Sequence, residues 1–216
     1  MSTGMGSSFS YGSYLPGITP EQEASLIHFK SVFSEWNSHI NLISRKDIDS
    51  FEVNHVLHSL AILRYIRFNP GAVVLDLGTG GGFPGIPLAI FFPQVKFILV
   101  DSIAKKTKAV AAMAEKLGLA NVEVVRARVE ELDCKVDYVV SRAVAPMQEL
   151  VRWTKGILVP GQKGSLPNGW VVLKGGDLKE ELSGFLKIAE IKPISDYWDD
   201  VFFETKKIVY LPRQVL

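Results

Sequence analysis

The stretch from Val73 to Gly85 constrains the fold of this 216-residue chain more than any other part. It begins with the apolar run Val73–Leu77, which is too short for a helix and is bounded by Gly71 and Gly78. Such a run is typical of a strand that is buried on both faces of a parallel sheet. Ligands of open α/β sheets bind beyond the carboxyl ends of the strands, so we expect a binding site in the glycine-rich loop that follows.

The loop is suited to holding an adenosine-bearing ligand through its backbone. Gly78, Gly80 and Gly82 can adopt positive φ, and they leave their N–H groups uncovered. Gly80-x-Gly82-x-x-Gly85 matches the fingerprint of dinucleotide-binding proteins, in which an acid about 20 residues further on holds the ribose. Asp101 takes that position at the end of the next apolar run.

A second pattern in the same loop favours S-adenosylmethionine over a dinucleotide. Asp76 precedes the first glycine by two residues, as in Rossmann-like methyltransferases. Its carboxylate can hold the ammonium group of the cofactor, directly or through water, whereas it would lie unfavourably beside the phosphates of NAD. We therefore expect Asp76, Gly78, Gly80, Gly82 and Asp101 to bind S-adenosylmethionine. The remaining alternative is a glycine turn that only packs a helix on a strand.

After this loop, apolar runs alternate with helical patterns, as in a doubly wound α/β sheet. We expect strands over residues 73–77, 95–100, 122–125, 136–140, 169–173, 188–194 and 207–211. We expect helices over residues 84–91, 104–117, 146–154 and 178–189. The last two strands lack room for a crossover helix and should pair antiparallel. The predicted fold class is α/β, a Rossmann-like class I S-adenosylmethionine-dependent methyltransferase with a mostly parallel seven-stranded sheet, an antiparallel edge strand and an N-terminal helical cap.

The chain before the sheet divides into a tail and a helical extension. The first 17 residues are dominated by Ser, Gly and Tyr, and we expect a flexible tail over residues 1–18. Thr19 and Gln22 have the spacing of a capping box at a helix start. Helices from there to about residue 39 and over residues 49–66 should make residues 19–68 an extension that packs on the methyltransferase domain of residues 69–216.

Two further strand ends point to cofactor contacts. Val129 and Glu130 follow the third strand, where a backbone amide and a carboxylate can read the edge of an adenine. Arg142 follows the fourth strand, where it would face the methyl-transfer pocket. An arginine at a strand end is also commonly an exposed ion-pair partner, and this alternative applies to Arg142.

The composition excludes several other functions. A net charge of +1 gives no overall field for nucleic acid, so such binding requires a local basic patch. The single cysteine, Cys134, cannot form an internal disulfide or a zinc cluster built on cysteines. His55 and His58 lack further residues at ligand spacing, so we predict packing or polar contacts there and no metal. No apolar run approaches the roughly 18 residues of a membrane span, and we expect a soluble, cytoplasmic protein.

A set of motifs extends from about residue 20 to the C-terminus. They are Trp36-Asn37 with Asn41-Leu42, His55-x-x-His58-Ser59-Leu60, the loop from Asp76 to Leu88 with its Phe-Pro-Gly-Ile-Pro segment, Asp101-Ser102 followed by Lys105-Lys106, Arg128-Val129-Glu130-Glu131, Ser141-Arg142-Ala143 and Leu173-Lys174-Gly175-Gly176. Together they resemble the RsmG family, also called GidB, bacterial enzymes that methylate N7 of a guanine in 16S ribosomal RNA. The chain departs from the family pattern at His58, where the family often has Asp.

The resemblance implies S-adenosylmethionine as cofactor, with contacts at Gly78, Phe83, Val129, Glu130 and Arg142. It also implies a reaction without a general base, because N7 of guanine already carries a lone pair, so Arg142 is expected to act by positioning the reactants. RNA contacts are expected from local basic residues, which are Arg45, Lys46, Lys105, Lys106, Arg126, Arg128, Arg142 and Lys174. The implied partner is 16S rRNA within the 30S subunit or its assembly intermediate, and the protein is expected to be a monomer.

The sequence leaves two other functions open. One is a small-molecule methyltransferase, because helical caps also occur in such enzymes. The other is a non-catalytic nucleotide- or RNA-binding module, including an NAD-binding regulator. Binding of S-adenosylhomocysteine without binding of NADH, and methyl transfer to 30S particles, would separate these functions.

Overall fold

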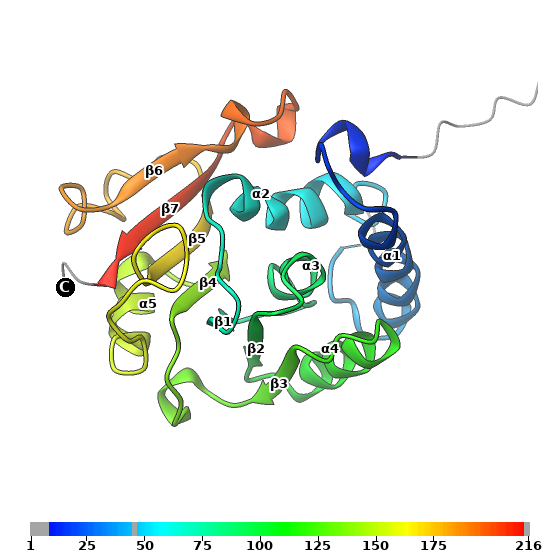
Figure 1. Ribbon diagram of the computed structural model, residues 1–216, viewed down its shortest axis with the longest axis horizontal. Coiled ribbons are helices and arrows are strands. Elements are labelled where there is room, and N and C mark those ends of the chain that lie inside the picture. The colour runs from blue at the N-terminus through cyan, green and yellow to red at the C-terminus, as the bar shows by residue number, and fades with distance from the viewer. Residues whose placement is uncertain (1–8, 45–46, 214–216) are drawn as a thin grey trace, which may run out of the picture.

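The computed structural model describes residues 9–44 and 47–213 and builds them around a seven-stranded sheet (Figure 1). The strands are β1 (Val73–Leu77), β2 (Lys96–Asp101), β3 (Val122–Arg126), β4 (Tyr138–Arg142), β5 (Gly169–Gly175), β6 (Glu190–Pro193) and β7 (Lys206–Pro212). They lie in the order β3-β2-β1-β4-β5-β7-β6. The chain moves outward from β1 to β3 and then crosses back to β4. The carboxyl ends of β1 and β4 therefore adjoin at the switch point where such sheets bind ligands.

The sheet confirms the predicted fold class. β1 has the predicted bounds, and the other strands begin and end within two residues of the predicted ones. β1 to β5 are parallel, and β7 pairs antiparallel with both β5 and β6, so the predicted antiparallel pairing of the last two strands is confirmed. The antiparallel strand β7 lies second from the edge, because it turns back from β6 and pairs with β5 on its other side.

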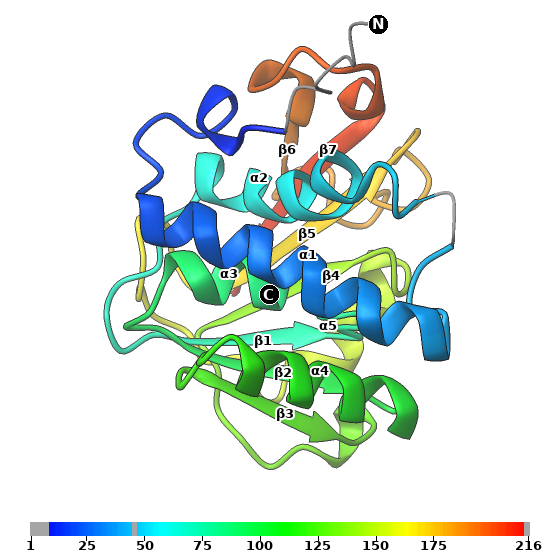
Figure 2. The ribbon, with the colours of Figure 1, turned by 90° about the vertical axis from the view of Figure 1, so that its right-hand side faces the viewer.

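Helices cover both faces of the sheet (Figures 1 and 2). On one face lie α1 (Pro20–Ile40), α2 (His58–Tyr65), α3 (Gly85–Phe91) and α4 (Ala104–Lys116), and α5 (Met147–Thr154) covers the other. A π-helix, η2 (Glu52–Leu57), leads directly into α2. Short 3-10 turns occur at Tyr11–Ser13, Val129–Glu131, Ile194–Asp196 and Val201–Phe203. Within the described ranges, no helix is long and apolar enough to span a membrane.

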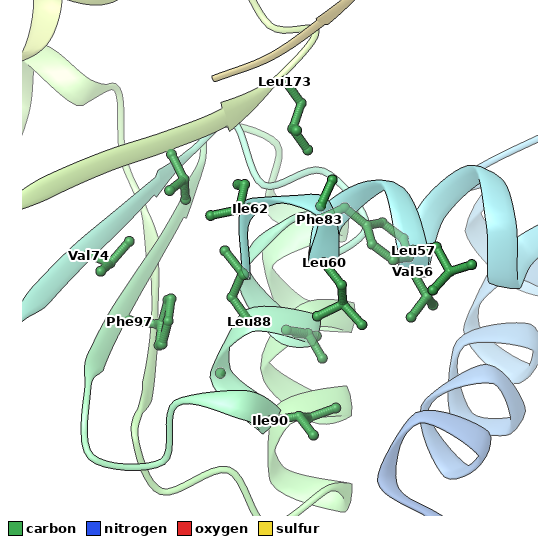
Figure 3. Packing of buried hydrophobic residues seen from close by; sticks show 14 of the residues in the cluster. Val56, Leu57, Leu60, Ile62, Val74, Phe83, Leu88, Ile90, Phe97 and Leu173 are labelled. Carbon is green, nitrogen blue, oxygen red and sulfur yellow. The ribbon is translucent and has the colours of Figure 1, made fainter. Parts of the chain in front are cut away.

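Successive residues of β1 pack on opposite faces of the sheet. Val74 belongs to a buried cluster that contains Leu60 of α2 and Leu88 of α3, whereas Leu75 packs in a second cluster with Leu150 of α5. Figure 3 shows side chains of η2, α2 and α3 converging on β1 and β2. The apolar run of β1 thus contributes to two cores at once, as its sequence predicts.

The start of α1 follows the predicted capping box. Thr19 Oγ1 accepts a hydrogen bond from the Gln22 N–H at 3.2 Å, and Gln22 Oε1 accepts one from the Thr19 N–H at 3.0 Å. The helix ends at Ile40, and Asn41 terminates it with a left-handed φ of 50°. The second predicted helix differs from the expectation, because its first part is the π-helix η2.

Part of the expected flexible tail is packed on the protein. Tyr11 and Leu15 are buried, and the Tyr11 N–H donates to Glu23 Oε1 at 3.1 Å. The Trp198 indole N–H donates to the Tyr14 carbonyl at 2.8 Å. The prediction was therefore wrong for residues 9–18, because aromatic side chains anchor a segment that is otherwise rich in Ser and Gly. The rest of the predicted tail, residues 1–8, lies outside the described residues.

The predicted helix over residues 178–189 does not form. The Leu182 N–H bonds the Leu178 carbonyl, but the Phe185 N–H bonds the Leu182 carbonyl, so the segment is a series of turns. Gly184 lies within it, and glycine is a poor helix former. Leu178 and Leu182 are buried in the cluster with α5, so their helix-like spacing reflects burial rather than a helix.

Candidate active site

A cavity of about 560 Å³ lies at the carboxyl ends of β1, β2 and β4. The expected cofactor residues in its lining are Gly78, Gly80, Phe83, Asp101, Val129, Glu130 and Arg142. Asp76 and Gly82 do not line it. The lining also contains residues that the sequence did not predict, among them Leu42, Ile43, Ser102, Ala127 and Trp153. The strand order thus gathers most of the predicted site into one place.

The glycine loop forms one wall of this cavity, and Gly78 and Gly80 disfavour side chains for different reasons. Gly78 has a φ of 68°, and a Cβ atom there would lie 2.5 Å from Val144 Cγ2. Gly80 has a φ of 57°, and a Cβ atom there would have no neighbour closer than 3.9 Å. A larger residue at 80 would therefore meet a strained backbone rather than a clash, and its side chain would project from the cavity wall.

Asp101 ties the end of β2 to the glycine loop. Its Oδ2 accepts a hydrogen bond from the Gly80 N–H at 3.1 Å, and its Oδ1 accepts one from the Ile103 N–H at 2.9 Å. Each carboxylate oxygen can accept a second hydrogen bond, and the side chain lines the cavity. Asp101 therefore lines the cavity with acceptor capacity to spare, and ribose hydroxyls remain its predicted partners.

Asp76 lies beneath the glycine loop and is fully buried. Its Oδ2 accepts hydrogen bonds from Thr79 Oγ1 at 2.6 Å and from the Gly85 N–H at 2.8 Å. Its Oδ1 has no hydrogen-bond partner among the described residues, and burial raises the pKa of Asp76 to about 7. Asp76 therefore holds the two ends of the loop together, and its unpaired oxygen is an acceptor that a cationic ligand could satisfy through water.

Arg142 leaves the end of β4 and rests against the N-terminal helices. Its Nη1 donates to the Asn54 carbonyl at 3.2 Å, and its Nη2 lies 3.0 Å from His55 Nδ1. The guanidinium also lies over the Phe83 ring, 4.7 Å from the ring centroid. Burial lowers the pKa of Arg142 to about 10 despite the attraction of Asp76. Arg142 therefore stays protonated at neutral pH, and it is held inside the site rather than in a surface ion pair.

The sequence did not predict the contact of His55 with Arg142 at this site. An arginine has only donors, so His55 Nδ1 must accept the hydrogen bond and the ring must be neutral. Burial, reinforced by the charge of Arg142, lowers the pKa of His55 to about 4. Asn54 and His55 both belong to η2, and π-helical turns are frequent at functional sites. The sequence predicts a polar contact for His55 but gives no signal for the π-helix that aims it.

The third strand end contributes the far part of the cavity. Val129 is buried and Glu130 is exposed in the 3-10 turn after β3, and both line the cavity. Trp153 of α5 lines the same cavity, which adds an aromatic ring that no predicted motif contained. An apolar turn and an indole ring can pack against a purine, and an exposed carboxylate can accept hydrogen bonds from its edge.

The basic residues expected to bind RNA lie in different environments. Lys105 and Arg126 are exposed, and Lys106 and Arg128 line the cavity. Lys174 is instead buried, and its ammonium is bonded to Glu181 Oε1 at 2.6 Å and to the Ala145 carbonyl, so it is no free surface cation. The predicted contacts Arg45 and Lys46 lie outside the described residues. In the part of the chain that the structure describes, no group of three or more His, Cys, Asp or Glu side chains is arranged to hold a metal ion.

The fold is that of the Rossmann-like class I methyltransferases. The magnesium protoporphyrin IX methyltransferase of Synechocystis, solved with bound S-adenosylmethionine, matches 92% of this chain and 100% of that one with a TM-score of 0.57 at 14% identity. An S-adenosylmethionine-dependent methyltransferase of Aquifex aeolicus matches 84% of this chain and 97% of that one with a TM-score of 0.56, also at 14% identity. At this identity the likeness shows the fold alone.

The chain belongs to the GidB family, described as rRNA small subunit methyltransferase G, whose model matches residues 22–202. It is 49% identical to ribosomal RNA small subunit methyltransferase G of Christiangramia forsetii over 93% of this chain and 95% of that protein. It is 48% identical to the protein of the same name from Porphyromonas gingivalis over 92% of this chain and 90% of that protein. The family resemblance predicted from the motifs is confirmed, and the small-molecule and non-catalytic alternatives are not favoured.

Proposed function

We propose that this protein transfers a methyl group from S-adenosylmethionine to N7 of a guanine in 16S ribosomal RNA. The observation that carries the proposal is the cavity in which the glycine loop, Asp101 and Arg142 meet at the ends of β1, β2 and β4. Membership of the family of small-subunit rRNA methyltransferases supports the substrate class. The resemblance of the sequence motifs supports guanine N7 as the acceptor.

The residues present fit this cofactor. Asp101 would hold the ribose hydroxyls, and Val129 with Glu130 would contact the adenine. Asp76 is buried beneath the loop and does not line the cavity, so its unpaired Oδ1 would act on the ammonium of the cofactor through water. The backbone of Gly80 can approach the ligand without a side chain in between. When bound, S-adenosylmethionine supplies an electrophilic methyl group on its sulfonium.

The chain's own residues have little proton chemistry to perform. A methyl group supplied by the cofactor would be taken up by the lone pair that guanine N7 already carries. No proton leaves the base, so positioning and exclusion of water supply the catalysis. Arg142 suits a positioning role because hydrogen bonds to Asn54 and His55 and a stacking contact with Phe83 fix its guanidinium.

We propose the 30S subunit or its assembly intermediate as the substrate, the cytoplasm as the location and a monomer as the acting form. Exposed basic residues beside the cavity, such as Arg128, support contact with RNA phosphates.

The test is methyl transfer from labelled S-adenosylmethionine to small subunits that lack this modification, with free 16S rRNA in parallel. Digestion to nucleosides and mass spectrometry then identify the product. We expect label in 7-methylguanosine, with the subunit the better substrate. Label in another nucleoside, or none in either substrate, would overturn the proposal.

A further inference from the structure

A second cavity of about 410 Å³ adjoins the first at the carboxyl ends of β4 and β5. The two cavities share Arg142, Ala143 and Val144. The other residues that line the second cavity are His58, Ala145, Pro146, Leu173, Lys174, Gly175, Glu181 and Lys206. A volume of this size lies within the range of about 300 to 1,000 Å³ that small-molecule sites occupy.

The wall between the cavities is the turn that follows β4. Ala143 adopts a left-handed φ of 53°, which is unusual for a residue with a Cβ atom. The next residue, Val144, contacts Gly78 so closely that no Cβ atom would fit there. Strained backbone that the surrounding structure enforces occurs preferentially at functional sites. Val144 of this turn therefore separates the second cavity from the glycine loop.

The second cavity has a preorganised polar end. Glu181 Oε1 accepts hydrogen bonds from the Met147 N–H at 3.0 Å and from the Lys174 ammonium at 2.6 Å. Both bonds end on Oε1, which leaves Oε2 as the acceptor for a ligand. His58 lines the same cavity with 6% of its surface exposed, and its Nε2 has no hydrogen-bond partner among the described residues. An unpaired buried polar atom in a cavity wall points to a polar ligand.

We propose that this second cavity holds the target guanine, flipped out of the ribosomal RNA. This inference rests on the proposed function. A base must leave its stack to present its Watson–Crick edge and N7 to a protein pocket. The N1–H and N2–H donors of guanine match the free oxygen of Glu181 at the polar end. The O6 acceptor matches Arg142 at the shared boundary, where two of the five guanidinium N–H groups already have partners. N7 then lies on the side of the base that faces the first cavity.

The same arrangement discriminates against adenine. Adenine presents an N6–H₂ donor where guanine has the O6 acceptor, and this donor would face the guanidinium of Arg142. Its Watson–Crick edge also offers an unprotonated N1 to the carboxylate of Glu181. Both mismatches leave Arg142 and Glu181 without the partners that guanine would supply, and a site built to hydrogen-bond its substrate rejects an analogue that cannot pair with it.

The first experiment fills the second cavity without touching the first. Ala145 lines only the second cavity, and Ala145→Phe should place a ring where the base would lie. We expect S-adenosylhomocysteine affinity by calorimetry within about twofold of wild type and a loss of at least about 100-fold in kcat/KM for small subunits. Ala111→Phe on the exposed side of α4 is the matched control and should behave like wild type.

A second variant keeps the test decisive if the phenylalanine disturbs folding. Glu181→Gln preserves the shape and the acceptor for Met147, but it places an amide donor toward the N1–H of guanine. We expect the KM for the subunit to rise at least about tenfold with cofactor affinity unchanged. Glu180→Gln, at the exposed neighbouring position, is its control.

The outcomes separate this inference from the proposed function. If wild-type protein makes no 7-methylguanosine, the proposed function fails and the guanine site falls with it. If wild type is active but a folded pocket variant methylates at the rate of its control, the inference alone is overturned. A folded Ala145→Phe variant that loses cofactor affinity also contradicts the inference, because the second cavity would then be part of the cofactor site.

Discussion

At the scale of single residues, Arg142 links the strand end to the N-terminal helices. Its guanidinium contacts Asn54, His55 and Phe83 and lines both cavities. Lysine keeps the charge but cannot donate to the Asn54 carbonyl and His55 Nδ1 in the same planar geometry. We therefore expect Arg142→Ala to lose most single-turnover methyl transfer, on the order of 100-fold or more, and Arg142→Lys to recover only part of it.

The controls for Arg142 are cofactor affinity and thermal stability, measured on the same preparations. An exposed ion-pair arginine would leave turnover and affinity unchanged when replaced by alanine. Methylation of small subunits by Arg142→Ala at the wild-type rate would therefore remove Arg142 from the active site.

Asp76 makes stability depend on pH. Burial raises its pKa to about 7 in the folded protein, whereas an unfolded aspartate titrates near about 3.9. Between these values the folded state holds a proton that the unfolded state has lost, so the contribution of Asp76 to stability falls as pH rises. Asp76→Asn keeps acceptors for Thr79 and Gly85 and does not titrate. In the cofactor-free protein, the Tm of this variant minus that of wild type should increase from about pH 5 to about pH 8. A constant difference would show that the carboxylate is already ionised at low pH.

For Asp76, the sequence predicted the position in the chain but not the hydrogen bonds that its side chain makes. The spacing of the acid and the glycines correctly located the loop, and Asp101 lies where the ribose acid was expected. The sequence could not show that Asp76 bonds Thr79 and Gly85 under the loop, because this depends on how the loop folds back over the strand. We therefore expect Asp76→Ala to weaken the loop as well as any cofactor contact.

At the scale of elements, α4 presents basic residues beside the cavity. Lys105 is exposed near its start, whereas Lys106 lines the cavity and is the less selective target. If Lys105 contacts a phosphate, Lys105→Ala should reduce the salt slope of RNA binding by just under about one unit and leave cofactor affinity unchanged. Lys192→Ala on the edge strand β6 is the control, with an unchanged slope expected. Equal slopes for both variants would exclude Lys105 from the RNA interface.

Elements were predictable where one physical signal dominated. The strands follow from short, nearly continuous apolar runs, and α1 follows from its capping box. The helix predicted over residues 178–189 was wrong because two buried leucines at helical spacing, Leu178 and Leu182, precede Gly184. The π-helix η2 has an ordinary helical pattern in sequence, and only the backbone of the folded protein shows that it is a π-helix.

At the scale of the whole molecule, the N-terminal helices and the sheet share one core. Phe29 of α1, Leu60 of α2 and Phe97 of β2 belong to the same buried cluster. Leu42 and Ile43, which follow α1, line the cavity at the ends of β1, β2 and β4. We therefore propose that residues 19–68 complete the methyltransferase domain rather than fold independently, and that their helices hold Arg142 in place.

The central claim is that the glycine loop and Asp101 bind S-adenosylmethionine rather than a nicotinamide dinucleotide. Calorimetric titration of the purified chain with S-adenosylhomocysteine and with NADH, repeated on Gly80→Val, tests it most directly. We expect saturable binding of S-adenosylhomocysteine and no binding of NADH. We also expect Gly80→Val to lose S-adenosylhomocysteine binding, because a β-branched residue is strained at the φ of 57° there. Binding of NADH by wild type, or wild-type affinity for S-adenosylhomocysteine in Gly80→Val, would contradict it.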